Sequence, residues 1–381
     1  MYLLRYRVLV TDSGQLCSNK LRGEHHYGGA TSCVGLGITQ IYYDPLGKDM
    51  ARRKTMKIQP AITDLYFIAD TASAGDSRSY IDTMRELSRV NRRLYEQGRM
   101  VAYQGLTYIW RDAADYDAGG GDIRSLQTIE VTVRTAGNTW VVHNAYVKGK
   151  ALWNEMQDLV LDDNPSVKGK WHDFKVQLSP EQVVARQLSV KDGAGTDVIG
   201  GEWNISTYVM PQHEVDTATG EPLAAVELTP TLIGIDTTTK RSLVKAYQQS
   251  RATVQPLDPN VPVAMSSSFF NLLTDSGSQE PELADVIEDE NDVPPYDTDN
   301  YPGGDVNAVS PLTVQYGAVS SAEVDGRLGG WVAPCGLLQI QIKGYQADGT
   351  EVATADMPPI DLLLHVAPGT YKGVAAIPMG Q

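Results

Sequence analysis

Arginines recur at helical spacing in one stretch of the chain. The intervals between them are seven, four and three residues, so on a helix the four side chains fall within a narrow arc. Clustered guanidinium groups neutralise phosphates, and a group of bases just upstream adds to the charge. The pattern indicates a phosphate-binding surface, with a solvated helix face as the alternative interpretation. The residues are Arg78, Arg85, Arg89 and Arg92, and upstream Arg52, Arg53, Lys54 and Lys57.

Two aspartate clusters offer oxygen ligands of the kind that calcium prefers. One lies in "DTDNYPGGD" and the other in the glycine-rich "DYDAGGGD". Neither has the register of an EF-hand with its terminal glutamate, so solvated turns are the favoured interpretation. Calcium at a subunit interface is the minority interpretation, and no other cofactor is expected. The residues are Asp297, Asp299 and Asp305, and Asp115, Asp117 and Asp122.

Side chains that bind zinc also gather near the start of the chain. Cys17, His25, His26 and Cys33 lie within seventeen residues, but their spacing matches no compact zinc motif. An ordinary loop is the favoured interpretation. The chain has three cysteines, which favours a reducing compartment over a disulfide framework.

Signatures of catalysis are mostly absent from the sequence. There is no G-x-S-x-G, H-E-x-x-H, G-x-x-x-x-G-K or strand-associated G-x-G-x-x-G motif. The "DSGS" at 275–278 has the composition of a linker. His172 and Asp173 are neighbours on an expected strand and so point to opposite faces. A hydrolase built from scattered strands stays an alternative without a nominated pair; its remaining histidines are His143, His213 and His365.

Helical periodicity marks the elements that carry these residues. The clearest helix runs from Ser79 to Gln97, with an apolar side opposite the arginines and Gly98 as its stop. A second helix is expected from Ala145 to Leu161, and a short third from Ser242 to Gln249.

Strand-like segments outnumber the helices. In "LQIQIK", Leu338, Ile340 and Ile342 alternate with polar residues from Gln339 to Lys343, which predicts one buried face and one wet face. Many short strands with Gly and Pro turns predict a mainly β fold, a jelly-roll β-sandwich with two or three helices in connecting segments. Further strands are expected at "YLLRYRVLV", "ITQIYY", "LYFIAD", "MVAYQGLTYIW", "LQTIEVTVRT", "KWHDFKVQLS", "WNISTYVM", "AAVELTPTLIGI", "LTVQYGAV" and "DLLLHVA".

Charge divides the chain into three parts. The formal net charge is −15, and residues 252–326 contain fourteen acids and no Lys or Arg. This part, rich in Pro, Ser and Gly, is expected to be an acidic surface insertion or projection. Residues 1–251 form the main part of the folded domain, and residues 327–381 supply its closing strands. No apolar run is long enough to span a membrane, and "MYLLRYRVLV" is typical of a strand, not a secretion signal.

Three stretches carry a resemblance to a known family. They are "IDTMRELSRVNRRLYEQGR" (81–99), "VVHNAYVKGKALWNEMQDLVLDDNPSVKGKWHDFKVQLS" (141–179) and the ending "APCGLLQIQIKGY…DLLLHVAPGTYKGVAA". Together they resemble capsid (coat) proteins of small circular single-stranded DNA viruses known from environmental sequences. The helix with "KALWNEM" followed by "GKWHDFKV" is the strongest element.

The resemblance implies a jelly-roll shell domain that self-assembles into an icosahedral shell around a single-stranded DNA genome. The protein would then be a structural virion component and not an enzyme, assembled in the interior of a host cell whose receptor is unknown. Many such proteins begin with an Arg/Lys-rich arm, whereas this chain begins with an expected strand. The two arginine and lysine groups would therefore face the genome, and residues 252–326 would face outward, where carboxylates keep particles apart.

A β-rich carbohydrate-binding or adhesin-type module is the main alternative, since 19 Tyr and 6 Trp are compatible with stacking on sugars. Particle size separates the two functions.

Overall fold

The computed structural model describes residues 6–10, 16–20, 60–110, 126–169, 171–210, 225–252, 311–320, 323 and 325–380. The chain divides into two units, Met1–Thr55 and Met56–Gln381, whereas the sequence placed residues 1–251 in one domain. In the first unit, β1 (Tyr6–Val10) pairs antiparallel with β2 (Leu16–Lys20).

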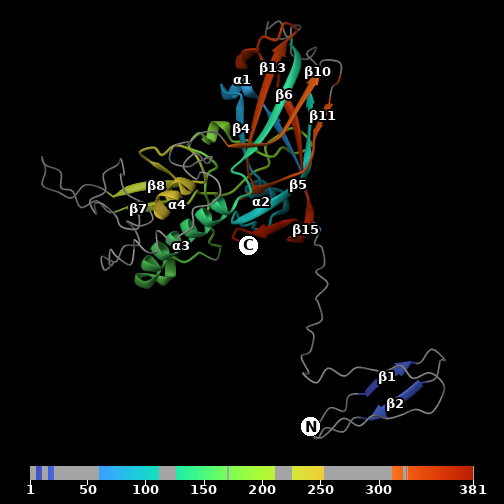
Figure 1. Cartoon of the computed structure of the whole chain (residues 1–381), viewed down its shortest axis with the longest axis vertical. Helices are drawn as coiled ribbons and strands as arrows, with labels where there is room; N and C mark the ends of the chain where they lie inside the picture. The colour runs from blue at the N-terminus through green and yellow to red at the C-terminus, as the bar shows by residue number, and fades with distance from the viewer. Residues whose placement is uncertain are drawn as a thin grey trace, which may run out of the picture. The chain divides into compact units, whose positions relative to one another are not determined.

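The described part of the second unit contains two large antiparallel sheets and a small three-stranded sheet in the insertion described below (Figure 1). The first has the order β10 (Leu312–Ser320), β6 (Leu126–Thr135), β13 (Leu337–Gln346), β4 (Arg78–Asp82). The second has the order β11 (Asp325–Leu328), β5 (Arg99–Trp110), β14 (Ile360–Val366), β3 (Asp64–Ala69). Two further strands, β12 (Trp331–Pro334) and β16 (Ala376–Pro378), also pair with β5.

One hydrophobic core lies between the two sheets. Leu338, Ile340 and Ile342 of β13 are buried in the same cluster as Leu362 and Leu364 of β14. The alternation predicted for these β13 residues is therefore confirmed on its apolar side. Each such side chain contributes roughly 1.5–3 kcal/mol to the stability of the fold by leaving water, so the shared core holds the two sheets together. The prediction of a mainly β fold is confirmed.

The chain crosses between the sheets in a regular order. If β3, β4, β5, β6, β10, β11–β12, β13 and β14 are numbered one to eight, one sheet has the order 1-8-3-6 and the other 2-7-4-5. The first and last strands are neighbours in one sheet, and the second and seventh are neighbours in the other.

Helices occupy the connections between strands. The short α1 (Thr71–Ala74) follows β3, and α2 (Thr83–Asn91) joins β4 to β5. The connection from β6 to β10 is much longer and contains α3 (Trp140–Asp163) and α4 (Leu243–Ala252). It also contains β7 (Tyr208–Met210), β8 (Val226–Thr231) and β9 (Lys240–Ser242). Single turns η4 (Pro165–Val167), η5 (Val184–Arg186) and η6 (Thr354–Asp356) and strand β15 (Pro368–Tyr371) complete the fold.

This long insertion forms a second core beside the sheets, where α3, α4, β7 and β8 lie together (Figure 1). Phe174 is fully buried in it, with ring-centroid distances of 5.4 Å to Tyr146 and 5.6 Å to Trp153. Tyr80 and Leu337, whose side chains leave β4 and β13 on the face away from the first core, belong to this second cluster. The insertion therefore covers the outer face of these two strands.

Covering that face explains an error in the sequence prediction. Gln339 was expected on a wet face but is 1% exposed, and its Nε2 donates to the Tyr80 hydroxyl at 2.7 Å. The segment "KWHDFKVQLS" was expected to be a strand, yet it is irregular apart from single contacts such as Gln177 N to Pro230 O at 3.1 Å. Its backbone bonds mainly to the insertion.

Of the three predicted helices, two are confirmed and one is wrong at both ends. Those at 145–161 and 242–249 are confirmed by the longer α3 and α4. The one from Ser79 to Gln97 is wrong at both ends, because residues 78–82 pair with β13 and the helix ends at Asn91. Arg92 takes a left-handed φ of 52° there, six residues before the expected stop at Gly98.

A short segment from the insertion crosses the open edge of both sheets. Leu188 N donates to Tyr80 O of the edge strand β4 at 2.8 Å, and Lys191 N donates to Tyr66 O of the edge strand β3 at 2.7 Å. We call residues 187–191 the edge strap. Exposed strand edges invite pairing with other chains, and the strap occupies this edge within the subunit.

We predict that Phe174→Ala lowers the free energy of unfolding by about 3–5 kcal/mol, because it leaves a cavity in the second core. Val184→Ala is the control, since Val184 is 90% exposed and its truncation should change stability by less than about 0.5 kcal/mol. Urea denaturation followed by tryptophan fluorescence measures both. Equal effects of the two substitutions would contradict the second core.

Candidate functional site

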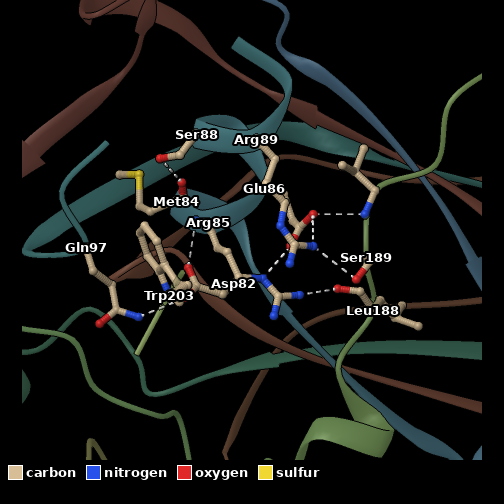
Figure 2. A network of polar contacts seen from close by, with 11 residues as sticks. Asp82, Met84, Arg85, Glu86, Ser88, Arg89, Gln97, Leu188, Ser189 and Trp203 are labelled. Atoms are coloured by element: carbon tan, nitrogen blue, oxygen red, sulfur yellow. Dashed lines mark hydrogen bonds and ion pairs between the residues drawn. The ribbon is translucent and has the colours of Figure 1, made fainter. Parts of the chain in front are cut away.

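The start of α2 is built around one buried carboxylate. Asp82 ends β4 and caps the helix, accepting the Arg85 backbone N–H at 3.1 Å. Its other oxygen accepts from Trp203 Nε1 at 2.8 Å and from Gln97 Nε2 at 3.1 Å (Figure 2). The cap therefore joins the helix to the segment before β5 and to the insertion.

Burial raises the pKa of Asp82 to about 6, while the charge of Arg85, the helix N–H and the Trp203 indole oppose the rise. These donors favour the ionised form of the carboxylate, although the residue is only 1% exposed.

A second buried carboxylate holds the edge strap. Glu86 is fully buried and accepts from Arg85 Nε at 2.5 Å, Arg89 Nη1 at 3.2 Å and Val190 N at 2.9 Å. Arg85 and Arg89 also bond to the strap, at Leu188 O (2.8 Å) and Ser189 Oγ (3.1 Å). We call Arg85, Glu86 and Arg89 with residues 188–190 the Glu86 clamp (Figure 2).

Gln97 anchors the other side of the network. Its backbone N–H donates to Asp173 Oδ2 at 2.8 Å, and its side chain bonds to both Val176 N (2.6 Å) and Val176 O (3.0 Å). Lys175 is 8% exposed and lies 4.3 Å from the ring centroid of Trp171. Burial raises the pKa of Asp173 and lowers that of Lys175. These contacts fasten the irregular segment to the sheets.

The arginine stripe expected from the sequence does not form one helical face. Arg78 lies on β4, where it pairs with Asp76 at 2.9 Å and with Glu181. The clamp uses two of the other arginines, and Arg92 is the exposed residue that ends α2. The helical face is broken because residues 78–82 pair with β13, and carboxylates neutralise three of the four charges.

Other predicted ligands lie outside the described residues. These are Arg52, Arg53, Lys54 and Lys57, the calcium candidates Asp297, Asp299 and Asp305, and Asp115, Asp117, Asp122, His25, His26, Cys33 and His213. The backbone of Cys17 lies in β2.

One constellation was missed by the sequence reasoning. Thr107 Oγ1 lies 3.1 Å from His365 Nε2, and His365 Nδ1 lies 2.8 Å from Asp64 Oδ1. These are the residue types of a nucleophile, base and orienting acid, brought together because β5, β14 and β3 are neighbours. The backbone around them pairs β14 with both β3 and β5. The group links strands on the sheet face.

Within the described ranges, no three His, Cys, Asp or Glu side chains converge as metal ligands, and Cys335 is a buried free thiol. No helix in the same ranges combines the length and apolar character needed to cross a membrane.

Comparison of the chain with protein-family models, curated proteins and solved structures found no match. The described polar network joins α2, the strap and the insertion.

We predict that Glu86→Ala lowers the free energy of unfolding by about 3–5 kcal/mol, because two arginines and the Val190 N–H lose their shared buried acceptor. Glu351→Ala is the control: Glu351 pairs with Lys343 at 2.9 Å, but both side chains are more than 30% exposed, so about 0–1 kcal/mol is expected. Chemical denaturation measures the free energy of unfolding of both variants. Similar losses of stability would contradict the stabilising role of the clamp.

We predict a pH-dependent penalty from Asp82. Its folded pKa of about 6 exceeds the ordinary aspartate pKa of 3.8, so the free energy of unfolding falls as the pH rises between these two values. Above pH 6 the full penalty, about 3 kcal/mol, is present. Asp82→Asn should therefore gain stability relative to the wild type from pH 4 to pH 7, as measured by denaturation at each pH. Asp325→Asn, at an exposed position, is the control for removing one carboxylate. A pH-independent difference for Asp82→Asn would contradict this account.

Proposed function

We propose that the chain is a jelly-roll capsid protein that self-assembles into an icosahedral shell around a single-stranded DNA genome. The observation that carries this proposal is the strand order, 1-8-3-6 in one sheet and 2-7-4-5 in the other. That order is the one expected when eight strands fold into two Greek keys and pack as a double-sheet jelly roll, an architecture used by viral capsid and lectin domains.

The positions of the three stretches that resemble capsid proteins support the same proposal. Gln97, from residues 81–99, bonds to Val176, from residues 141–179, at 2.6 Å. Thr83 N donates to Gly336 O, from the third stretch, at 2.9 Å. Stretches far apart in the sequence thus form one contact network.

Exposed apolar side chains on the insertion support association with further copies. Several large apolar side chains on the insertion are exposed: Leu159 (72%), Val160 (54%), Val184 (90%) and Ile199 (81%). Because the strap occupies the β3–β4 edge, we propose that copies meet through such apolar segments and not by adding strands at that edge.

The acidic part of the chain keeps its proposed outward position. Within residues 252–326, β10 and the start of β11 are strands of the two sheets, and residues 253–310 lie outside the described residues. We propose that the acidic residues of the segment 252–326 face the exterior of the virion. Calcium at subunit contacts is a secondary part of this proposal. Carboxylates beside a genome would repel its phosphates.

We predict that the expressed full-length protein forms megadalton particles or discrete capsomers in size-exclusion chromatography, and closed shells in negative-stain microscopy. Nucleic acid inside such shells should survive nuclease treatment of intact particles and be digested after the particles are dissociated. A lone monomer that binds glycans would contradict the proposal and favour the carbohydrate-binding alternative.

A further inference from the structure

Two exposed and two partly exposed cations gather where α2 ends and β5 begins. Arg92 and Arg93 follow the last turn of α2 and are exposed, and Arg99 is the first residue of β5. Lys372 follows β15, which Figure 1 shows close to α2 at one end of the sheets. We call these four residues the α2–β15 patch.

Contacts between distant parts of the chain hold the patch together. Arg93 Nη1 lies 3.4 Å from Lys372 O, and the Tyr95 hydroxyl donates to the same carbonyl at 2.8 Å. Lys372 Nζ in turn donates to Leu94 O. The residues involved are nearly 280 positions apart in the chain, so the fold creates the patch.

Two tyrosine rings position the cationic groups. Arg99 Cζ lies 3.5 Å from the ring centroid of Tyr371, and Lys372 Nζ lies 5.1 Å from it. Tyr95 packs edge-on against Tyr371 at 6.0 Å. Cations over tyrosine faces are attracted by the ring quadrupole, which restricts their motion before any ligand arrives.

The patch keeps most of its positive charge. Among the described residues, Glu96 is the one carboxylate that pairs with it, 3.5 Å from Arg99. Arg99 Nε is buried without a hydrogen-bond acceptor there. By contrast, carboxylates neutralise Arg78, Arg85 and Arg89. Four cations against one carboxylate leave a surface suited to several phosphates and not to one small anion.

We infer that the α2–β15 patch binds the phosphate backbone of single-stranded nucleic acid. Arginine forks bind phosphate oxygens in pairs, and binding of a polyanion releases its counterions. This inference rests on the proposed shell function and replaces the helical arginine stripe as the genome contact. Arg93 Nη1 also donates to Pro60 O at 3.1 Å.

The test is binding of a fluorescent 30-nucleotide oligo(dT) to full-length protein, followed by anisotropy over a range of NaCl concentrations. The patch variant is Arg92→Gln/Arg93→Gln/Lys372→Gln, which keeps polar side chains. Loss of three phosphate contacts should reduce the slope of log affinity against log salt by about 2, at about 0.7 per contact. Affinity at low salt should fall at least about tenfold.

The control variant removes the same charge elsewhere. Lys168→Gln/Arg327→Gln/Lys343→Gln changes two exposed residues and one partly exposed residue far from the patch in sequence. It should bind within about threefold of the wild type, with an unchanged slope. Equal weakening by both variants, or wild-type binding by the patch variant, would overturn the inference.

Particle formation, measured on the same preparations, separates this inference from the shell proposal. If the patch variant loses DNA binding and the wild type forms no particles, the inferred DNA-binding role of the patch stands and the shell proposal is wrong. If shells form and the patch variant binds oligo(dT) like the wild type, the shell proposal stands and the inferred role of the patch is wrong. If the patch variant blocks assembly in nucleic-acid-free conditions and binds oligo(dT) normally, the patch contacts an acidic surface of another copy, which overturns the inference.

Discussion

The buried carboxylate of Glu86 is the contact on which the rest of the structure depends. A buried charge is tolerated only when it is paired and hydrogen-bonded, and Glu86 meets this condition with two arginines of its own helix and the Val190 N–H of the edge strap. The pairing therefore does two things at once. It neutralises the outer face of α2, and it holds the strap against β4 and β3, where the two sheets would otherwise end in unpaired backbone groups.

The long connection between β6 and β10 is consequently part of the β structure and not an appendage. It supplies the edge strap, and through Phe174 and its neighbours it covers the outer face of β4 and β13. A subunit whose edge is closed by its own chain can meet other copies without strand exchange. This property suits a shell built from many identical subunits, since open strand edges lead to uncontrolled pairing.

Local patterns predicted the elements whose environment is uniform along their length. The apolar side of β13 and the first half of the α3 stripe, from Ala145 to Trp153, are examples. Prediction failed where a distant segment changes one position: Tyr80 has helical periodicity but pairs in β4, and Gln339 is buried because the insertion covers it. The arginine stripe was visible, and so was Glu86 within it, but its partner Val190 lies over a hundred residues away. Likewise, Thr107, His365 and Asp64 meet only through strand order.

Hydrogen–deuterium exchange on the full-length protein, before and after assembly, tests the closed edge most directly. The amides to follow are those of Leu188, Val190 and Lys191, which donate to Tyr80 O, Glu86 Oε2 and Tyr66 O. The account predicts slow exchange of the peptide covering residues 187–191 in free subunits, unchanged by assembly. Fast exchange in free subunits that becomes slow only in particles would show that a neighbouring copy closes the edge, which would contradict it.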